Sequence, residues 1–382
     1  MKKLFAIVLC LSLLLTAACS ADVPQVTDPA ETTEAPQTTE PTEATEPAKP
    51  GAEIFTDELK AKLDGVLEQN KYEGIVSLTC DGETVYQWVK GTNDLGEPLT
   101  IASPMFIAST SKQFCAAAIL MLRDQGKLSL DDTLEKYYPE YTIGKDITLH
   151  QMLSMQSGIP RDPVAVHENP ELYADSSLEE NLAAIRQWTF EQPLLFTPGT
   201  RMEYCNLNYN LLSMIVSQVS GQSYNEFIRQ NIFEPLGMTH SGFHGEVREN
   251  PDWAKGLTYD KLLESSRING IVQGCGDIVT TAGDMELWMA ALQSGQVVSM
   301  ESFREMTTVH TTGYGYGLTP LLRGGWGHGG NLEAYSSEDY FNSEYGLTLY
   351  MVNNNTSVYR MDISNKTMNA LLKVIFEAMD AA

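Results

Sequence analysis

Basic residues are scarce in this 382-residue sequence, which has 25 Lys and Arg against 50 Asp and Glu and a formal net charge of -25. Proteins that bind nucleic acids neutralise phosphates with clustered Lys and Arg side chains, and the sequence shows no such cluster. Loss of a leader containing Lys2 and Lys3 would make the remainder more acidic still. This balance argues against a nucleic acid partner and against charge-driven membrane binding.

Cysteine is rare too, with six residues and no Cys-x-x-Cys pair, the spacing typical of zinc cages. The sequence therefore predicts no metal site, and we expect no other cofactor. Cys10 and Cys19 fall in the leading segment. Cys115 lies in an apolar helical stretch, which favours buried thiols over a disulfide, although the sequence alone cannot pair the remaining cysteines. These are Cys80, Cys115, Cys205 and Cys275.

The leading apolar run, Leu4 to Leu15, is too short to span a bilayer comfortably and follows the basic Met1-Lys2-Lys3. This pattern predicts a signal peptide over residues 1–18. The following Cys19 ends a small-residue stretch that resembles a lipoprotein signal, in which the cysteine is diacylated and becomes the new N-terminus. Plain cleavage near Ala21 is the alternative. Both predict an extracytoplasmic protein, and the first predicts a lipid anchor in the bacterial cell membrane.

Apolar residues are nearly absent from residues 19–52, which consist mainly of Thr, Glu, Pro and Ala. Such a segment cannot offset its ordering entropy by burial, so we predict a disordered tether. At about 3 Å per residue it would let the folded part work up to ~100 Å from its anchor. The chain as a whole is 43% apolar and 20% charged, which lets residues 53–382 bury a large core.

Strand patterns occur at both ends of residues 53–382, with helical patterns between them. Thr56 precedes apolar residues at helical spacing, and residues 74–80 and 84–90 are predicted strands joined by an Asp81-Gly82 turn. Further strands are predicted within residues 324–354. The predicted later helices are 207–219, ended by Gly221, then 224–233, 282–292 and 361–379.

This order of elements predicts a fold class. Strands at both ends of a chain with helices between them are typical of an α/β sandwich with a central antiparallel sheet. The mainly helical pattern over about residues 128–271 predicts an inserted all-helical lobe.

Two common hydrolase motifs are missing, since no Gly-x-Ser-x-Gly occurs and His167-Glu168 lacks the second histidine of a zinc-protease motif. A Ser-x-x-Lys is present instead, at Ser109 and Lys112, and Ser109 would begin a helix. Three residues apart on a helix means one face, so the ammonium can lie against the hydroxyl, and the helix N-terminus favours a developing oxyanion. Alone the pair is a weak signal, because about one chance match is expected.

Two further elements follow. Tyr204-Cys205-Asn206 stands just ahead of the predicted helix 207–219, so that Tyr204 and Asn206 can both face a cleft. His328-Gly329-Gly330-Asn331 has glycines that let a ligand approach a strand closely, although an ordinary glycine-rich hairpin has the same composition. A second Tyr-x-Asn, Tyr340-Phe341-Asn342, falls in the strand-rich tail, where we interpret the tyrosine as a sheet residue.

In this order, the three motifs resemble those of the serine beta-lactamase and penicillin-binding-protein family, especially its class C, DD-peptidase and esterase branches. The resemblance covers about residues 55–380 and includes Ile147–Leu153, Glu234–Met238 and Tyr314–Gly317. It implies a beta-lactamase/DD-peptidase-like fold. It also implies a cofactor-free serine hydrolase that acts through an acyl-enzyme on a small ester, amide or D-amino-acid peptide, including cell-wall fragments, at the cell surface.

The family's roles can be carried over residue by residue. Ser109 would attack an acyl carbonyl, Lys112 would ease deprotonation of its neighbours, and Tyr204 would act as general base and acid. Asn206 would hold Lys112 and the substrate. The backbone N–H groups of Ser109 and Asn331 would form the oxyanion hole. The substrate-binding strand would be His328, Gly329 and Gly330.

The sequence departs from the family at this strand, where penicillin-binding enzymes typically show Lys-Thr-Gly. With His328-Gly329-Gly330 both the fixed cation and the hydroxyl are missing. Those groups usually recognise a substrate carboxylate, so we expect an esterase, amidase or D-amino-acid peptidase rather than an efficient beta-lactamase. Glu333 is a second departure, which would repel anionic substrates if it faced the site.

Two alternatives belong to other functional classes. A catalytically silent sensor or binding protein would keep the fold, with Ser109 acylated slowly or not at all, and the intact motifs argue against it. A solute-binding lipoprotein would share the signal peptide, Cys19 and tether, but has no need of three ordered motifs.

Overall fold

The computed structural model describes residues 51–93, 95–160, 177–246, 267–310, 313–332, 335–354 and 361–382. The predicted signal peptide, Cys19, almost all of the predicted tether and Glu333 lie outside the described residues. No helix in the described ranges is long and apolar enough to cross a membrane.

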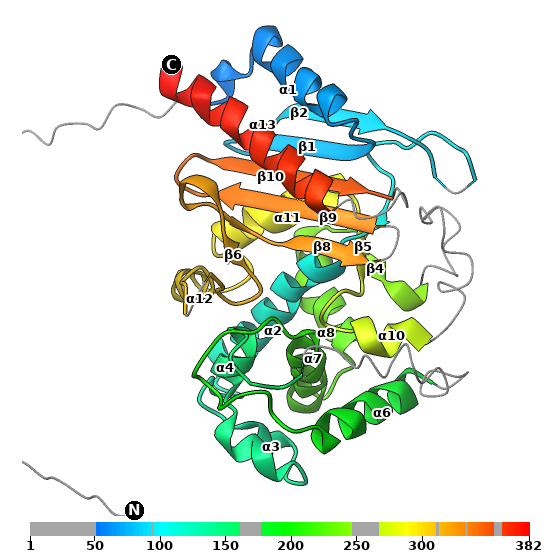
Figure 1. The fold of residues 1–382 in the computed structure, drawn as a ribbon, viewed down its shortest axis with the longest axis vertical. Coiled ribbons are helices and arrows are strands. Elements are labelled where there is room, and N and C mark those ends of the chain that lie inside the picture. Colours follow the sequence, from blue (N-terminus) through cyan, green and yellow to red (C-terminus); the bar gives the residue numbers. More distant parts are fainter. Residues whose placement is uncertain are drawn as a thin grey trace, which may run out of the picture. The chain divides into compact units, whose positions relative to one another are not determined.

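Seven of the described strands form an antiparallel sheet that joins the two ends of the folded chain (Figure 1). Its path runs β2-β1-β10-β9-β7-β6, and β8 pairs with β9 beside that path. The predicted hairpin is confirmed, with Asp81 and Gly82 at positive φ between its strands. The bounds are β1 Gly74–Cys80, β2 Glu83–Lys90, β6 Thr319–Pro320, β7 Trp326–Gly327, β8 Gly329–Leu332, β9 Tyr335–Asn342 and β10 Leu347–Asn353.

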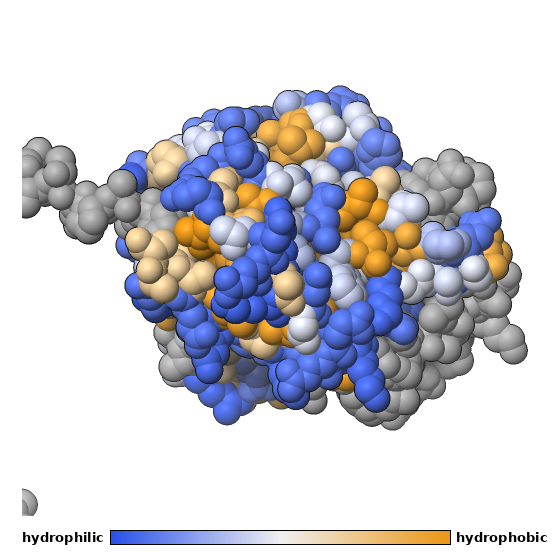
Figure 2. Space-filling view, turned by 90° about the horizontal axis from the view of Figure 1, so that it is seen from above, coloured by the Kyte–Doolittle hydropathy of each residue, from blue (hydrophilic) through white to orange (hydrophobic). Residues whose placement is uncertain are grey.

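Helices cover both faces of this sheet. Helix α1 (Asp57–Gln69), capped by the Thr56 hydroxyl as predicted, packs with α13 (Met361–Ala381), and together with β1, β9 and β10 they enclose one apolar core. Helix α11 (Ala282–Gln293) packs against β1 and β10 and belongs to a second, larger core. On the side seen from above in Figure 2, hydrophobic residues form separate groups among hydrophilic ones. The central sheet with flanking helices confirms the predicted fold class.

The region from 128 to 271 is mainly helical where it is described, and it also contains the two-residue strand β4 (Gly242–Phe243). Helix α7 ends as predicted, with Gly221 in the left-handed conformation. The predicted helix 224–233 is helical throughout, although its second half, Arg229–Phe233, is a π turn between α8 and α9. The helices are α3 Leu134–Tyr137, α4 Leu149–Leu153, α6 Leu178–Glu191, α7 Asn206–Ser220, α8 Tyr224–Ile228, α9 Glu234–Leu236 and α10 Arg267–Val272.

A second, three-stranded sheet lies next to the Ser-x-x-Lys segment, and its strand β3 comes just before Ser109 in the chain. It has the order β3-β5-β4, with β3 Met105–Phe106, β4 Gly242–Phe243 and β5 Ile278–Thr280. Strand β3 leads directly into the turn that carries Ser109, and helix α2 (Lys112–Asp124) follows that turn. The Ser111 hydroxyl accepts the Ile278 N–H at 3.1 Å, which fastens this segment to β5. Helix α12 (Met300–Met306) follows α11.

Candidate active site

Ser109 lies in a tight turn between the small sheet and α2. A 3-10 turn over Ala108–Ser111 precedes the helix, so the α-helix begins at Lys112 rather than at Ser109 as predicted. Ala108 has a φ of 46°, a left-handed conformation that costs a non-glycine residue energy and is found where surrounding structure imposes it. The Ser109 side chain is half-buried, whereas its neighbours in the turn are buried.

Lys112 is fully buried and points its ammonium at Ser109. Lys112 Nζ donates to Ser109 Oγ at 3.0 Å and to the Cys275 carbonyl at 2.7 Å. The predicted contact between the two motif residues is therefore present. The Cys275 carbonyl is a partner that sequence reasoning missed, because it lies 163 residues from Lys112 and no motif marks it.

Tyr204 comes from the segment that precedes α7. The Lys112 ammonium lies 5.0 Å from the centroid of its half-buried ring, so the second predicted motif reaches the same place as the first. Asn206 is the first residue of α7, and its side-chain oxygen is buried. The role of Asn206 in holding Lys112 stays a prediction.

His328 is buried beside this group and carries no charge. Its Nδ1 lies 2.6 Å from the Gly329 carbonyl, which can only accept, so Nδ1 carries the proton and Nε2 accepts from the Tyr314 hydroxyl at 2.9 Å. Burial, reinforced by the charge of Lys112, lowers the pKa of His328 to about 3. The Tyr204 and His328 rings lie 6.0 Å apart between centroids. The segment Tyr314–Gly317 contributed to the family resemblance, but no role was predicted for Tyr314.

Strand β8 passes directly against the Ser109 turn. A Cβ on Gly330 would lie 2.1 Å from the Ile107 carbonyl oxygen and 3.1 Å from the Ala108 Cβ, so only glycine allows this approach. Asn331, the next residue of β8, is exposed. The proposed oxyanion hole between the N–H groups of Ser109 and Asn331 remains a prediction that this approach supports.

The predicted alternative Tyr-x-Asn lies elsewhere. Tyr340 is a fully buried residue of β9 whose hydroxyl donates to the Leu322 carbonyl, as expected for a sheet residue. The four predicted thiols are buried: Cys80, Cys115, Cys205 and Cys275.

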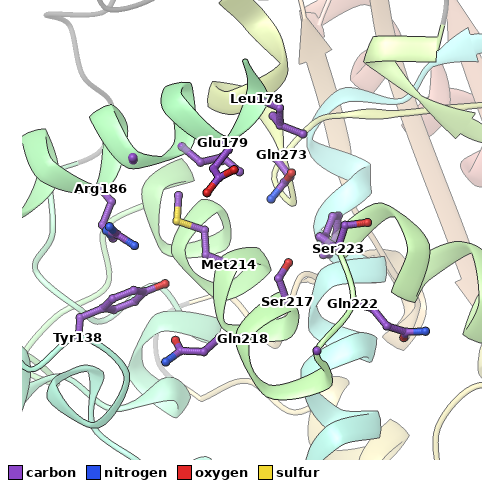
Figure 3. Close-up of a pocket in the computed structure, with 14 residues that line it drawn as sticks. Tyr138, Leu178, Glu179, Arg186, Met214, Ser217, Gln218, Gln222, Ser223 and Gln273 are labelled. Carbon is purple, nitrogen blue, oxygen red and sulfur yellow. The ribbon is translucent and has the colours of Figure 1, made fainter. Parts of the chain in front are cut away.

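A cavity of about 720 Å³ lies in the helical region, lined mainly by α6 and α7 (Figure 3). Its polar side chains include Tyr138, Arg186 and Gln218, and none of the predicted catalytic residues lines it. This cavity therefore does not mark the candidate catalytic site. The contacts among Ser109, Lys112 and Tyr204 do, because they combine a nucleophile with groups able to move its proton.

Comparisons with known proteins agree with this geometry. The chain is 28% identical over 322 residues to the putative penicillin-binding protein PbpX of Bacillus subtilis, covering 80% of this chain and 76% of that protein. The octameric penicillin-binding protein homologue of Pyrococcus abyssi has a similar structure, with a TM-score of 0.67, 28% identity and coverage of 83% and 78%.

The D-amino acid amidase of Ochrobactrum anthropi SV3 shares the fold, with a TM-score of 0.70, 22% identity and coverage of 85% and 98%. A model of the beta-lactamase family matches residues 59–367. Because that match spans most of the chain, the protein belongs to the beta-lactamase family.

Proposed function

We propose that this protein is a serine hydrolase that forms an acyl-enzyme at Ser109 on small esters, amides or D-amino-acid peptides whose binding does not depend on a carboxylate. The observation that carries the proposal is the 3.0 Å contact between the buried Lys112 ammonium and Ser109 Oγ. A cation at this distance favours the alkoxide over the hydroxyl and so makes the serine a nucleophile.

The first step is acylation. Ser109 Oγ attacks the substrate carbonyl as its proton passes to Tyr204, which acts as the phenolate, and the Lys112 ammonium offsets the negative charge that the two oxygens share. The oxygen of the tetrahedral intermediate is held by the backbone N–H groups of Ser109 and Asn331. Tyr204 then returns the proton to the leaving alcohol or amine. Water repeats the sequence on the acyl-enzyme, releases the acid and restores the Ser109 hydroxyl.

The substrate preference rests on His328. Penicillin-binding enzymes place a lysine at this strand, and a neutral imidazole with a pKa of about 3 supplies no positive charge to a substrate carboxylate. The similarity to a D-amino acid amidase supports an amide or D-amino-acid substrate, and the similarity to penicillin-binding proteins supports a cell-wall fragment. At the cell surface, anchored through Cys19, the protein would reach such substrates in the wall.

The test is intact-protein mass spectrometry after exposure to a fluorophosphonate, a p-nitrophenyl ester and a penicillin, with Ser109→Ala as the matched control. We expect Ser109-dependent adducts from the first two probes and little from penicillin. Full labelling by penicillin would contradict the proposed substrate preference and indicate a DD-peptidase or beta-lactamase. If no probe labels the wild type, the silent binding protein becomes the better description.

A further inference from the structure

The backbone N–H and the carbonyl of His328 are each held by a buried side chain. Its N–H donates to Asp339 Oδ1 at 2.8 Å, and its carbonyl accepts from the Thr110 hydroxyl at 3.0 Å. The backbone bond from the Asp339 N–H to the His328 carbonyl is long, at 3.4 Å. His328 lies between β7 and β8, where the pairing with β9 is interrupted. Side chains therefore supply most of the positioning that two short ladder bonds would otherwise give at this residue.

Thr110 is one of these supports. It directly follows Ser109, is fully buried, and lies with its hydroxyl 3.0 Å from that of Ser337 on β9. The Ser337 hydroxyl in turn donates to the Ile107 carbonyl at 2.6 Å. Two hydroxyls thus join the segment around Ser109 to His328, the residue before β8, and to β9.

Gln113 is the other support and directly follows Lys112. Its Nε2 lies 2.8 Å from both carboxyl oxygens of Asp339, and its Oε1 accepts from the Trp288 indole at 2.9 Å. An indole N–H can only donate, so it fixes which end of the Gln113 amide faces Asp339. All three side chains are fully buried. Such a satisfied network resists displacement, because each broken bond leaves a buried polar group without a partner.

We propose that Thr110 and the Gln113–Asp339 pair are positioning residues that set β8 against the Ser109 turn, and thereby the separation of the two oxyanion N–H donors. The inference rests on the proposed acyl transfer at Ser109. Transition-state stabilisation by such donors depends on their placement to within a fraction of an ångström. A β8 segment released at His328 would therefore slow acylation more than it weakens substrate binding.

The first test uses Thr110→Val, which keeps the shape and removes the hydroxyl. We expect kcat for a p-nitrophenyl ester to fall about 10- to 100-fold with KM changed less than about threefold, a smaller loss than removal of one oxyanion donor outright. Thr110→Ser keeps the hydroxyl and should recover most of the rate. Thr79→Val is the matched control, because it removes a buried hydroxyl that pairs with that of Thr348 between β1 and β10.

The second test exchanges the amide and the carboxyl. Asp339→Asn sets two amide donors against each other, and Gln113→Glu sets two carboxyls against each other, so each should slow acylation by a similar factor. The double variant Gln113→Glu/Asp339→Asn has the same atoms in exchanged positions. In this double variant, residue 113 can still accept from the Trp288 indole and residue 339 can still accept from the His328 N–H. We therefore expect acylation at least about tenfold faster than in either single variant.

Hydrogen exchange of peptides covering residues 327–332, followed by mass spectrometry on the same proteins, separates this proposal from the proposed function. We expect faster hydrogen exchange in Thr110→Val, Asp339→Asn and Gln113→Glu, but not in Thr79→Val. Unchanged exchange, or faster exchange with an unchanged acylation rate, would overturn the positioning role. If the wild type is not acylated, the proposed function fails, and the exchange result alone decides whether these side chains hold β8.

Discussion

At the scale of single residues, His328 and Tyr314 form a neutral, hydrogen-bonded pair beside the buried cation of Lys112. The imidazole accepts the tyrosine hydroxyl at Nε2, and burial holds its pKa near 3. Burial also raises the pKa of Tyr314 well above its usual value. Neither group changes charge near neutral pH, so the electrostatic environment that His328 and Tyr314 give the Lys112 ammonium does not change there.

We therefore predict that His328 contributes no step to the pH dependence of acylation. Between about pH 5 and pH 9 the imidazole is neutral in the folded protein, so His328→Gln should lower the rate without moving any apparent pKa. The lowered pKa also affects folding. As the pH falls below 6.5, the unfolded chain protonates His328 but the folded protein does not, so the free energy of unfolding decreases. Stopped-flow acylation with a neutral p-nitrophenyl ester across this range measures the profile. An acid-side step present in the wild type and absent from the variant would contradict the prediction.

The motif residues could be predicted from the sequence because their spacing reflects local geometry. Ser109 and Lys112 share a helical turn, and the separation of three residues suffices to predict the contact. The contacts of Thr110 and Gln113 could not be predicted, since their partners lie 218 and 226 residues away. Asp339 was harder still to predict. Aspartate is almost never fully buried in proteins, and nothing in the sequence marks this one as an exception.

At the scale of elements, the approach of β8 to the Ser109 turn depends on one glycine. Gly330 leaves no space for a Cβ between the Ile107 carbonyl and the Ser337 hydroxyl, which would lie 2.1 Å and 2.5 Å away. Strand β8 can therefore lie this close to the Ser109 turn only because residue 330 has no side chain. Gly317 plays a similar part on the other side of the turn, where a Cβ would lie 2.6 Å from the Lys112 carbonyl oxygen.

We predict that Gly330→Ala displaces β8 and lowers kcat for a neutral ester by about 10²-fold or more, because it moves an oxyanion donor. The overpacked contact should also destabilise the fold by roughly 1–3 kcal/mol. Gly283→Ala in α11 is the control, since a Cβ there meets nothing within 4 Å and alanine suits a helix better. Ester kinetics and thermal unfolding of both variants provide the measurement. A normal rate in Gly330→Ala would show that β8 does not supply a donor.

Elements with strong local patterns were the predictable part of the fold. Thr56 caps α1, the Asp81-Gly82 turn joins β1 to β2, and Gly221 ends α7, each for a local backbone reason. The two-residue strands β4 and β7 carry too few residues to show a period of two. The pairing of β1 with β10 is a contact between chain ends, which local patterns do not specify.

At the scale of the whole molecule, buried acids lie in both sheets' surroundings, Asp277 just before β5 and Glu338 and Asp339 on β9. Burial raises the pKa of Asp277 and of Asp339 to about 7, and that of Glu338 to about 8. Glu338 lies on β9 with its carboxyl close to the Gly329 backbone and only 2% of its surface exposed. Between the usual and the raised pKa, such a group holds a proton more often in the folded than in the unfolded protein, so it becomes less favourable to folding as the pH rises.

We predict that Glu338 makes the fold less stable as the pH rises from about 4.5 to 8. Its pKa is higher in the folded than in the unfolded protein, so the folded state binds the extra proton across this range and loses that stabilisation as the pH passes the folded value. Glu338→Gln keeps the shape without the ionisation, so the Tm of the variant relative to wild type should rise by at least about 2 °C between pH 5 and pH 8. Glu301→Gln, at an exposed position of α12, removes the same formal charge as a control. Scanning calorimetry of the three proteins measures the differences, and parallel pH dependence of wild type and Glu338→Gln would refute an ionisation at this site.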